Sequence, residues 1–525
     1  MRSVLSLLTL LFGVCYSLFS QSEFDALRYS TIGSGGTART MGMAGSFSAI
    51  GADASAVMTN PAGIATFRRS EFNMGTQFQN TIYHVDYLGE NLREARLNFN
   101  LPSLNYIKAD VQYDATGKPR KKGLSAVCYG FHINRLATFG GIMTFQGNNR
   151  RSSITDFFAE VANREGDPSK LVEGSLPGLA YNAWVIDYDR GGSGRYTSAY
   201  KDSIRNNDQT GEIVSKGAIY EYQGSVGLNF SNKVMLGLGL LYSSLRYSED
   251  LSMLEQDKRK VDINDISTLD MASLDYQSKF TDKGGEFAAR VGLIVRPTEQ
   301  LRLAASVHTP RTYVVNSEYG YSIAPKGDPG SIGDWTAQYN DPLNTYKYKI
   351  TTPSRFNAGI GFVIQKTMLI NADFEFYNYG SARLRADDVF TFNAENSAIR
   401  RNYRNVTNVR IGAEWNMPNK DNKDQAYRFR AGFGVLPSPF NPNVAGLNTE
   451  LKKANTVLGC GFGLRDKDYY FDFALSSQSA AGFYTPYPIT DPQFKPNDSQ
   501  DLSQELTYTR NRVFLTFTLG LNLDY

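Results

Sequence analysis

The chain has 525 residues, a formal net charge of +3 and a mean hydropathy of −0.36. A charge this small, with basic and acidic residues scattered along the chain, argues against a nucleic-acid-binding protein. Beyond the N-terminus, no apolar run approaches the roughly 20 residues of a membrane-spanning helix. The chain is nevertheless rich in Tyr and Phe, with 32 of each, which suits β-strands, including strands that cross a membrane.

The N-terminus has the three parts of a secretory signal peptide. Arg2 provides positive charge, residues 4–14 form an apolar core, and residues 17–20 offer a cleavage site before Gln21. We therefore predict a signal peptide over residues 1–20 and a mature protein in the cell envelope. Cys15 raises the alternative of a lipoprotein, which the bulky residue before it disfavours.

The next stretch, residues 21–70, does not have the pattern of a strand. It is rich in small residues, with glycines at positions 33, 35, 36, 42 and 45. Small residues let a backbone approach other parts of a protein closely, so a segment of this kind can pack inside a barrel.

From residue 71 onwards, apolar and polar residues alternate with the period of two that strands produce. In the last strand every odd position from Val513 to Tyr525 is apolar, whereas the even positions after Phe514 are small or polar. One face of such a strand suits lipid and the other suits a lumen. An arginine at Leu519 should therefore harm membrane insertion more than an arginine at Thr518.

The same alternation recurs in pairs of segments joined by short turns, and long polar segments separate the pairs. We therefore predict an all-β fold, a transmembrane antiparallel β-barrel of about 14 strands over residues 71–525, with the N-terminal segment plugging its lumen. Short periplasmic turns would alternate with long extracellular loops. The longest loops are expected at residues 148–217, 248–284, 317–349 and 479–507.

Residues 124–147 allow two interpretations. Odd positions are mostly apolar both before and after an interruption that consists of Asn134, Arg135, Leu136, Ala137 and Thr138, so the parity is the same on its two sides. The segment is either one long interrupted strand or a hairpin that turns near Asn134. An even-stranded barrel with both ends in the periplasm needs a single strand here, which favours the first interpretation. The interruption itself is either a functional break or an ordinary bulge.

The first long loop carries apolar residues at helical spacing, namely Ile154, Phe157, Phe158 and Val161. They either pack the loop against its neighbours or form part of an external landing site for an apolar ligand.

Other signs of chemistry are few. The three histidines are dispersed, so neither a haem nor a metal site is expected, and no Ser/His/Asp grouping indicates a hydrolase. We therefore expect neither an enzyme nor a cofactor. Charges of both signs fall on lumen-facing positions and should pair, because an unpaired buried charge is costly. They are Glu286, Arg290, Arg302, Arg355, Asp373, Glu375, Arg410, Glu414 and Asp472.

Several motifs resemble the FadL/TodX family of outer-membrane transporters. The clearest lie in the N-terminal segment, at residues 36–45 (GTARTMGMAG), 49–53 (AIGAD) and 60–63 (NPAG). Weaker pieces at residues 290–297, 352–355, 373–375 and 436–440 extend the resemblance over most of the mature chain. Length and composition are most similar to the Bacteroidota branch of the family.

The resemblance implies a 14-stranded barrel whose N-terminal hatch, here residues 21–70, plugs the lumen. It maps the family's hatch motif onto Asn60, Pro61, Ala62 and Gly63. It also implies a kinked third strand that opens the wall sideways, here at residues 134–138. Pro61 restricts Asn60 to extended backbone, and Gly63 would permit an abrupt exit. The motif is then either a rigid stopper on the ligand path or only a structural turn.

Two hypotheses of function follow. The first is passive transport of hydrophobic small molecules, such as long-chain fatty acids, across the outer membrane of a Gram-negative bacterium, with lateral exit into outer-membrane lipid. The alternative is a non-transporting barrel subunit or scaffold in a secretion or assembly complex, with other envelope proteins as partners. The hatch motif favours transport, whereas long polar loops and a charged lumen favour the scaffold.

Overall fold

The structure is a computed structural model. It describes residues 23–33, 35–198, 206–258, 271–327, 337–339, 345–386, 391–444, 449–489 and 505–523. The signal peptide predicted for residues 1–20 lies outside the described residues.

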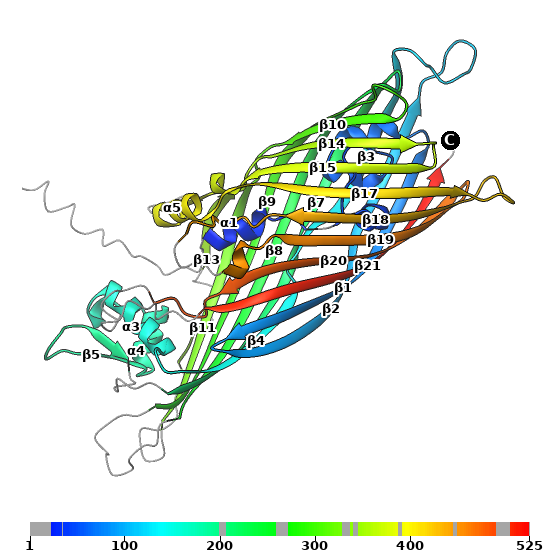
Figure 1. The fold of residues 1–525 in the computed structure, drawn as a ribbon. Helices are drawn as coiled ribbons and strands as arrows, with labels where there is room; N and C mark the ends of the chain where they lie inside the picture. Colours follow the sequence, from blue (N-terminus) through cyan, green and yellow to red (C-terminus); the bar gives the residue numbers. More distant parts are fainter. Residues whose placement is uncertain are drawn as a thin grey trace, which may run out of the picture.

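Fourteen antiparallel strands form a closed barrel (Figure 1), which confirms the predicted fold class. The last strand pairs with the first from Ser70↔Leu523 to Asp86↔Thr507, and this pairing closes the wall. Four strands are interrupted and carry two labels each. In wall order the strands are β1 (Ser70–Tyr87), β2 (Glu90–Val111), β3 (Leu124–Thr138) with β4 (Gly141–Asn149), β7 (Asn207–Phe230), β8 (Val234–Asp257), β9 (Met271–Val295), β10 (Leu301–His308) with β11 (Thr312–Gly327), β14 (Arg355–Ile364) with β13 (Thr345–Thr351), β15 (Met368–Asn378) with β16 (Arg383–Ala386), β17 (Asn405–Pro418), β18 (Ala426–Leu436), β19 (Asn455–Arg465), β20 (Tyr469–Tyr484) and β21 (Leu506–Leu523).

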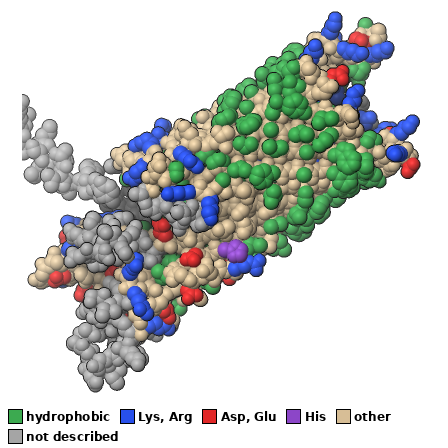
Figure 2. Space-filling model, viewed as in Figure 1, with side chains coloured by type: hydrophobic (Ala, Val, Ile, Leu, Met, Phe, Trp, Pro, Cys, Tyr) green, Lys and Arg blue, Asp and Glu red, His purple; other side chains and the backbone are tan. Residues whose placement is uncertain are grey.

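The two faces of the wall differ as the alternation predicts. On β21, Leu519 and Leu521 point outward and are 52% and 45% exposed, whereas Thr516 and Thr518 point inward and are buried. Outward-facing apolar side chains gather in a band over the half of the barrel that carries the short turns (Figure 2). None of the helices in the described part of the chain has the length and apolar character needed to cross a bilayer.

The third strand is a single interrupted strand, and the hairpin interpretation is wrong. β3 and β4 both pair with β7 in the same direction, from Leu124↔Phe230 to Asn149↔Asn207. The register shifts between Arg135 and Ala137, and the strand is broken at residues 139–140. The sequence interruption therefore corresponds to a bulge followed by a break.

Much of what was predicted as outer loop is strand. β7, β8 and β9 have 24, 24 and 25 residues, more than twice the roughly 9–11 that cross a bilayer. The upper halves of these strands, which lie farther from the short turns, keep the alternation, but their outward positions become polar. The barrel therefore continues well beyond its apolar band.

The first outer connection folds into a small helical unit. Ile154, Phe158 and Val161 lie on one side of α3 and are almost fully buried, which supports packing rather than a landing site. A short further strand, β12 (Ala337–Tyr339), pairs with β11 beyond β13 and extends the wall there. The remaining elements outside the wall and the N-terminal segment are α3 (Ile154–Glu165), η3 (Pro168–Lys170), α4 (Leu176–Asn182), β5 (Ile186–Tyr188), β6 (Tyr196–Ser198), η4 (Tyr379–Ser381), α5 (Asn393–Asn402) and η5 (Thr449–Lys452).

The described residues before β1, from Glu23 onwards, lie inside the barrel (Figure 1). They contain α1 (Glu23–Ser30), α2 (Ala38–Gly42), η1 (Ala54–Met58) and η2 (Pro61–Thr66). We call residues 38–69 the plug. The link between α1 and α2, residues 31–37 without the undescribed residue 34, is called the strap.

Candidate functional site

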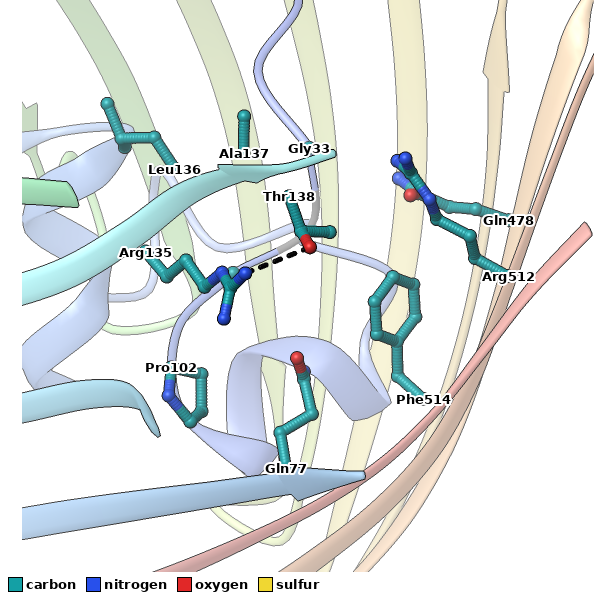
Figure 3. A pocket seen from close by; sticks show the side chains of 11 residues that line it. Gly33, Gln77, Pro102, Arg135, Leu136, Ala137, Thr138, Gln478, Arg512 and Phe514 are labelled. Atoms are coloured by element: carbon teal, nitrogen blue, oxygen red, sulfur yellow. Dashed lines mark hydrogen bonds between the residues drawn. The ribbon is translucent and has the colours of Figure 1, made fainter. Parts of the chain in front are cut away.

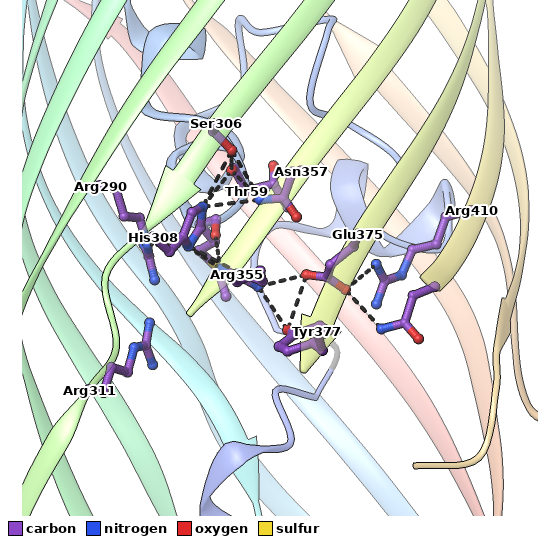
Figure 4. A network of polar contacts seen from close by, with 12 residues as sticks. Thr59, Arg290, Ser306, His308, Arg311, Arg355, Asn357, Glu375, Tyr377 and Arg410 are labelled. Atoms are coloured by element: carbon purple, nitrogen blue, oxygen red, sulfur yellow. Dashed lines mark hydrogen bonds and ion pairs between the residues drawn. The ribbon is translucent and has the colours of Figure 1, made fainter. Parts of the chain in front are cut away.

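Wall residues bind the plug at the end of η1, where backbone carbonyls have no partner within the helix (Figure 4). Such carbonyls carry partial negative charge, so donors and cations stabilise them. The carbonyl oxygen of Thr59 accepts from Ser306 Oγ at 2.6 Å, His308 Nε2 at 2.8 Å and Asn357 Nδ2 at 3.0 Å. The carbonyl oxygen of Met58 accepts from Arg355 Nη2 at 2.8 Å.

The arginines beside this cluster are paired with carboxylates. Glu375 accepts from Arg355 at 2.8 Å and from Arg410 at 2.9 Å. Glu221 accepts from Arg290 at 2.5 Å and from Arg311 at 2.8 Å. The expected pairing of lumen charges is therefore confirmed for these residues. Glu221 was missed in the sequence, although its inward-facing position on β7 was visible in the alternation.

A second charged cluster ties α2 to the neighbouring wall strands β17 and β18. Arg39 donates to both carboxylate oxygens of Glu414, at 2.7 and 2.8 Å, and Glu414 also accepts from Arg430 at 2.7 Å. Burial alone would lower the pKa of the Arg39 guanidinium, but Glu414 outweighs it and holds that pKa above its ordinary value. Asp373 accepts from the backbone N–H groups of Phe47 and Ser48, at 2.7 and 3.1 Å. The plug is thus held by ionic and backbone contacts on several sides.

The predicted motif Asn60, Pro61, Ala62 and Gly63 lies on the plug and faces the inner side of the wall. Asn60 has extended backbone, as expected before proline, and its Oδ1 caps η2 by accepting from Ala62 N at 3.0 Å. Its Nδ2 donates to the carbonyl oxygens of Ser48 at 3.1 Å and Leu293 at 3.2 Å.

Glycine is required at two wall positions that residues 60–62 approach closely. A Cβ at Gly292 would overlap Asn60 Oδ1, and a Cβ at Gly237 would overlap the backbone of Pro61 and Ala62. The expectation that Gly63 ends the turn is wrong. Gly63 lies within η2, where a Cβ would come within 3.3 Å of Gly51 and Ala56, so its role is close packing inside the plug.

Residues 134–138 form a different site, next to the strap. Asn134 is the last residue of β3 that pairs with β2, opposite Ser103. Beyond it, the carbonyl oxygen of Leu136 accepts from the backbone N–H of Gly33 at 2.8 Å. A Cβ at Gly35 would overlap the carbonyl oxygen of Arg135. The structure therefore brings residues 134–138 together with the strap, and Asn60 binds elsewhere on the wall.

The wall is split at this place. Residues 90–102 of β2 continue to pair with β1, up to Glu90↔Tyr87, but in the described part of the chain their other edge has no strand partner. β4 pairs with β7 alone and packs on the inner side of β1, where the rings of Tyr87 and Phe145 lie 5.0 Å apart. Arg135 crosses the split and donates to Asn100 Oδ1 on β2.

The split lies at the level of the apolar band. The register places Phe99 of β2 beside Phe78 of β1, which is opposite Leu515 of β21, which is opposite Leu475 of β20. Phe99 is 60% exposed, and its neighbour on the same face, Leu97, is 68% exposed. The free edge is therefore flanked by outward-facing apolar side chains.

A small cavity lies behind the split (Figure 3). Arg135, Leu136, Ala137 and Thr138 line it on one side and the strap glycines on another. Its volume is about 10 Å³, which is room for about one water molecule, so the wall is closed to larger molecules in this structure. Arg512 and Gln478 also line the cavity and were missed in the sequence, although Arg512 shares the inward-facing parity of Thr516.

The described residues contain no group of three or more His, Cys, Asp or Glu side chains placed to hold a metal ion. His132 instead bonds to Asn105 at 3.1 Å and Ser225 at 2.8 Å.

No family model and no curated protein matches the chain. Solved structures do. The fold is similar to that of FadL-type channels. The Pseudomonas putida toluene transporter TodX is 12% identical, with a TM-score of 0.47, and the match covers 94% of this chain and 100% of TodX. A Pseudomonas aeruginosa FadL homologue is 11% identical, with a TM-score of 0.49, and the Ralstonia pickettii toluene transporter TbuX is 13% identical, with a TM-score of 0.47. Both matches cover 94% of this chain, and they cover 100% and 99% of the respective channels.

Proposed function

We propose that this protein is an outer-membrane transporter through which hydrophobic small molecules diffuse passively, and that they leave sideways between β2 and the broken third strand. One observation carries the proposal, namely the free edge of β2 at residues 90–102, of which the part from Leu97 to Leu101 lies within the apolar band. Unpaired backbone N–H and C=O groups are costly in hydrocarbon, so closed barrels avoid them. A barrel that keeps such an edge gains a place where the wall can part without breaking existing strand pairs.

The strap is the proposed gate. It closes the inner side of the split through the bond between Gly33 and Leu136, and it is joined to α1, whose aromatic side chains fill the lumen above the plug. Tyr29 of α1 contacts the rings of Phe139 and Tyr247, at centroid distances of 5.9 and 6.1 Å. Displacement of α1 and the strap would open an aromatic-lined route to the split, and an apolar cargo would reach lipid without crossing water.

The motif Asn60, Pro61, Ala62 and Gly63 would then act as an anchor. Asn60 joins two parts of the plug to β9, and wall glycines let η2 lie directly on the backbone of the strands. We propose that the plug stays in place while α1 and the strap move.

A reversible crosslink across the split tests the proposal. A Cβ at Gly140 would lie 3.4 Å from Asn98 Cγ, so cysteines at these two positions are close enough to be joined. In a Cys460→Ser background, the double variant Asn98→Cys/Gly140→Cys should stop flux of an apolar fluorescent tracer into proteoliposomes when oxidised. Reduction should restore the flux, and each single variant should transport under both conditions. Equal flux in the oxidised and reduced double variant would refute lateral exit.

The scaffold hypothesis has a separate outcome. If the parent protein carries no apolar tracer, and a stoichiometric protein partner remains bound in mild detergent, the barrel is a complex subunit. The partner would most simply bind the helical unit of α3 and α4, where Trp184 is 61% exposed.

A further inference from the structure

Two arginines beside the split lack the carboxylate partners that several other buried arginines in the lumen have. Arg39, Arg290, Arg355 and Arg430 each contact a Glu or Asp within 3 Å. In the part of the chain that the structure describes, no carboxylate forms an ion pair with Arg135 or Arg512. Among the same described residues Arg302 also lacks a carboxylate partner, but it lies elsewhere in the lumen, so Arg135 and Arg512 differ from it in sharing one cavity.

Arg512 is a deeply buried cation. It lies on the inward face of β21, its exposed fraction is 7%, and its Nε has no hydrogen-bond partner. A buried guanidinium without a counter-charge is costly, because it loses hydration and gains no ionic contact.

Arg135 approaches the same cavity from the third strand (Figure 3). Its side chain donates to neutral acceptors, Asn100 Oδ1, Thr138 Oγ1 at 3.0 Å and the carbonyl oxygen of Gly217 at 3.5 Å. Its Nε is buried and also lacks a partner. Both guanidinium groups thus retain donor capacity next to one small space.

The rest of the lining suits an anion. Thr138 offers a hydroxyl, Gln77 adds an amide that already donates to Thr516 Oγ1 at 3.0 Å, and no acidic residue lines the cavity. Leu136 and Phe514 form an apolar side, which lowers the local dielectric and strengthens charge-assisted hydrogen bonds. The volume of about 10 Å³ is room for about one water molecule, so a chloride ion or a carboxylate needs small side-chain movements and a phosphate or sulfate ester needs much larger ones.

We infer that the cavity between Arg135 and Arg512 binds a small monovalent anion, either a free ion the size of chloride or the carboxylate head group of a cargo. The anion would link the third strand to β21 behind the split and offset the positive charge there. This inference rests on the proposed transport function only if the anion is the head group of a cargo. A free ion would bind whether or not the barrel transports.

Thermal unfolding of the purified, full-length mature protein tests the site. Unfolding is measured as the loss of heat-modifiable mobility on a gel. Sodium chloride is compared with sodium gluconate at equal ionic strength, because gluconate is too large for the cavity. In a second arm, binding of dodecanoate is compared with binding of dodecanol in mild detergent. The variant is Arg512→Gln, and Arg302→Gln is the matched control, because Arg302 is a lumen arginine that donates to the carbonyl oxygen of Ile50 at a different place.

The expected result is a saturable rise of the unfolding midpoint with chloride, or binding of dodecanoate at least tenfold tighter than dodecanol. Arg512→Gln should abolish the chloride effect, or weaken dodecanoate binding about tenfold or more, whereas Arg302→Gln should retain it. A response to chloride identifies a free ion, and a response to dodecanoate alone identifies a head group.

Arg512→Lys keeps the charge and should keep part of the response, which covers the case in which Arg512→Gln does not fold. The inference is overturned if chloride and dodecanoate act equally on the parent and the folded Arg512 variants, or on neither. Absence of neutral-tracer flux in the parent, by contrast, counts against transport and leaves the anion site standing.

Discussion

The backbone N–H of Gly33 donates a hydrogen bond of 2.8 Å to the carbonyl oxygen of Leu136. This hydrogen bond joins the N-terminal strap to the third strand at the place where β3 leaves β2. Because the strap is also joined to α1, any movement of the N-terminal helix acts directly on the broken part of the wall. The coupling needs no long-range pathway, since gate and wall share one hydrogen bond.

Gly35→Ala should loosen this contact. A Cβ at Gly35 would overlap the carbonyl oxygen of Arg135, so the strap must move away from the wall. We expect increased leak of an apolar tracer in proteoliposomes, with the barrel still folded. Gly224→Ala is the matched control, because a Cβ at that outward-facing position meets nothing within 4 Å. Leak equal to that of the parent would show that the strap does not gate the split.

Ala137→Trp should have the opposite effect on flux. Ala137 is small, 7% exposed and lines the cavity behind the split, so a bulky ring there fills the proposed exit. Tracer flux should fall at matched protein levels while surface expression stays unchanged. Gly224→Trp places the same ring on the outward face of β7 and should transport normally. Unchanged flux in Ala137→Trp would argue for another exit.

Asn60→Ala should destabilise the plug. It removes the η2 cap and the donor to Ser48 and Leu293, for an expected loss of about 1–3 kcal/mol of unfolding free energy. Denaturant unfolding of the purified barrel measures the loss, and tracer flux should change as well. Asn60→Ser keeps an oxygen that can cap η2 and loses the amide donor, so its stability should lie between those of the parent and Asn60→Ala. If Ser and Ala cost the same, the cap contributes nothing.

Leu519→Arg should reduce insertion, by about 2–4 kcal/mol if the residue lies near the bilayer midplane. The side chain points outward and is 52% exposed, so an arginine there would meet hydrocarbon. Folding yield into liposomes is the measurement, with Leu519→Ala as the control for lost bulk. Similar yields for the Arg and Ala variants would place Leu519 outside the apolar band.

Thr518 shows what the sequence alternation could not reveal. Its inward direction was predicted, and so was a mild effect of arginine there, as if it faced an open lumen. In the structure Thr518 Oγ1 accepts from Ala38 N at 2.8 Å and is fully buried under the plug. The milder effect is therefore not expected, because an arginine would displace α2. Alternation reports which face a residue occupies, but it carries no information about what lies opposite.

The same limit separates the other features that the sequence predicts from those that only the folded structure reveals. Strand number, the unbroken direction of the third strand and the pairing of charges such as Arg355 with Glu375 follow from local period and simple charge balance. The inward turn of β4, the free edge of β2 and the lack of a carboxylate beside Arg512 among the described residues depend on registers between strands far apart in sequence. Those registers leave no local signal, so the cavity between Arg135 and Arg512 emerged only with the fold.

The length of β7, β8 and β9 has a consequence for where cargo is first met. At about 3.3 Å per residue, strands of 24 or 25 residues are about 80 Å long, roughly twice what a tilted strand needs inside a bilayer. We therefore propose that the polar upper parts of these three strands extend above the membrane surface (Figure 1). In the proposed transport function, cargo would first be met in water, beyond the lipid head groups, and would leave through the split at the level of the apolar band. Capture and release would then take place at different heights of one barrel and in different solvents.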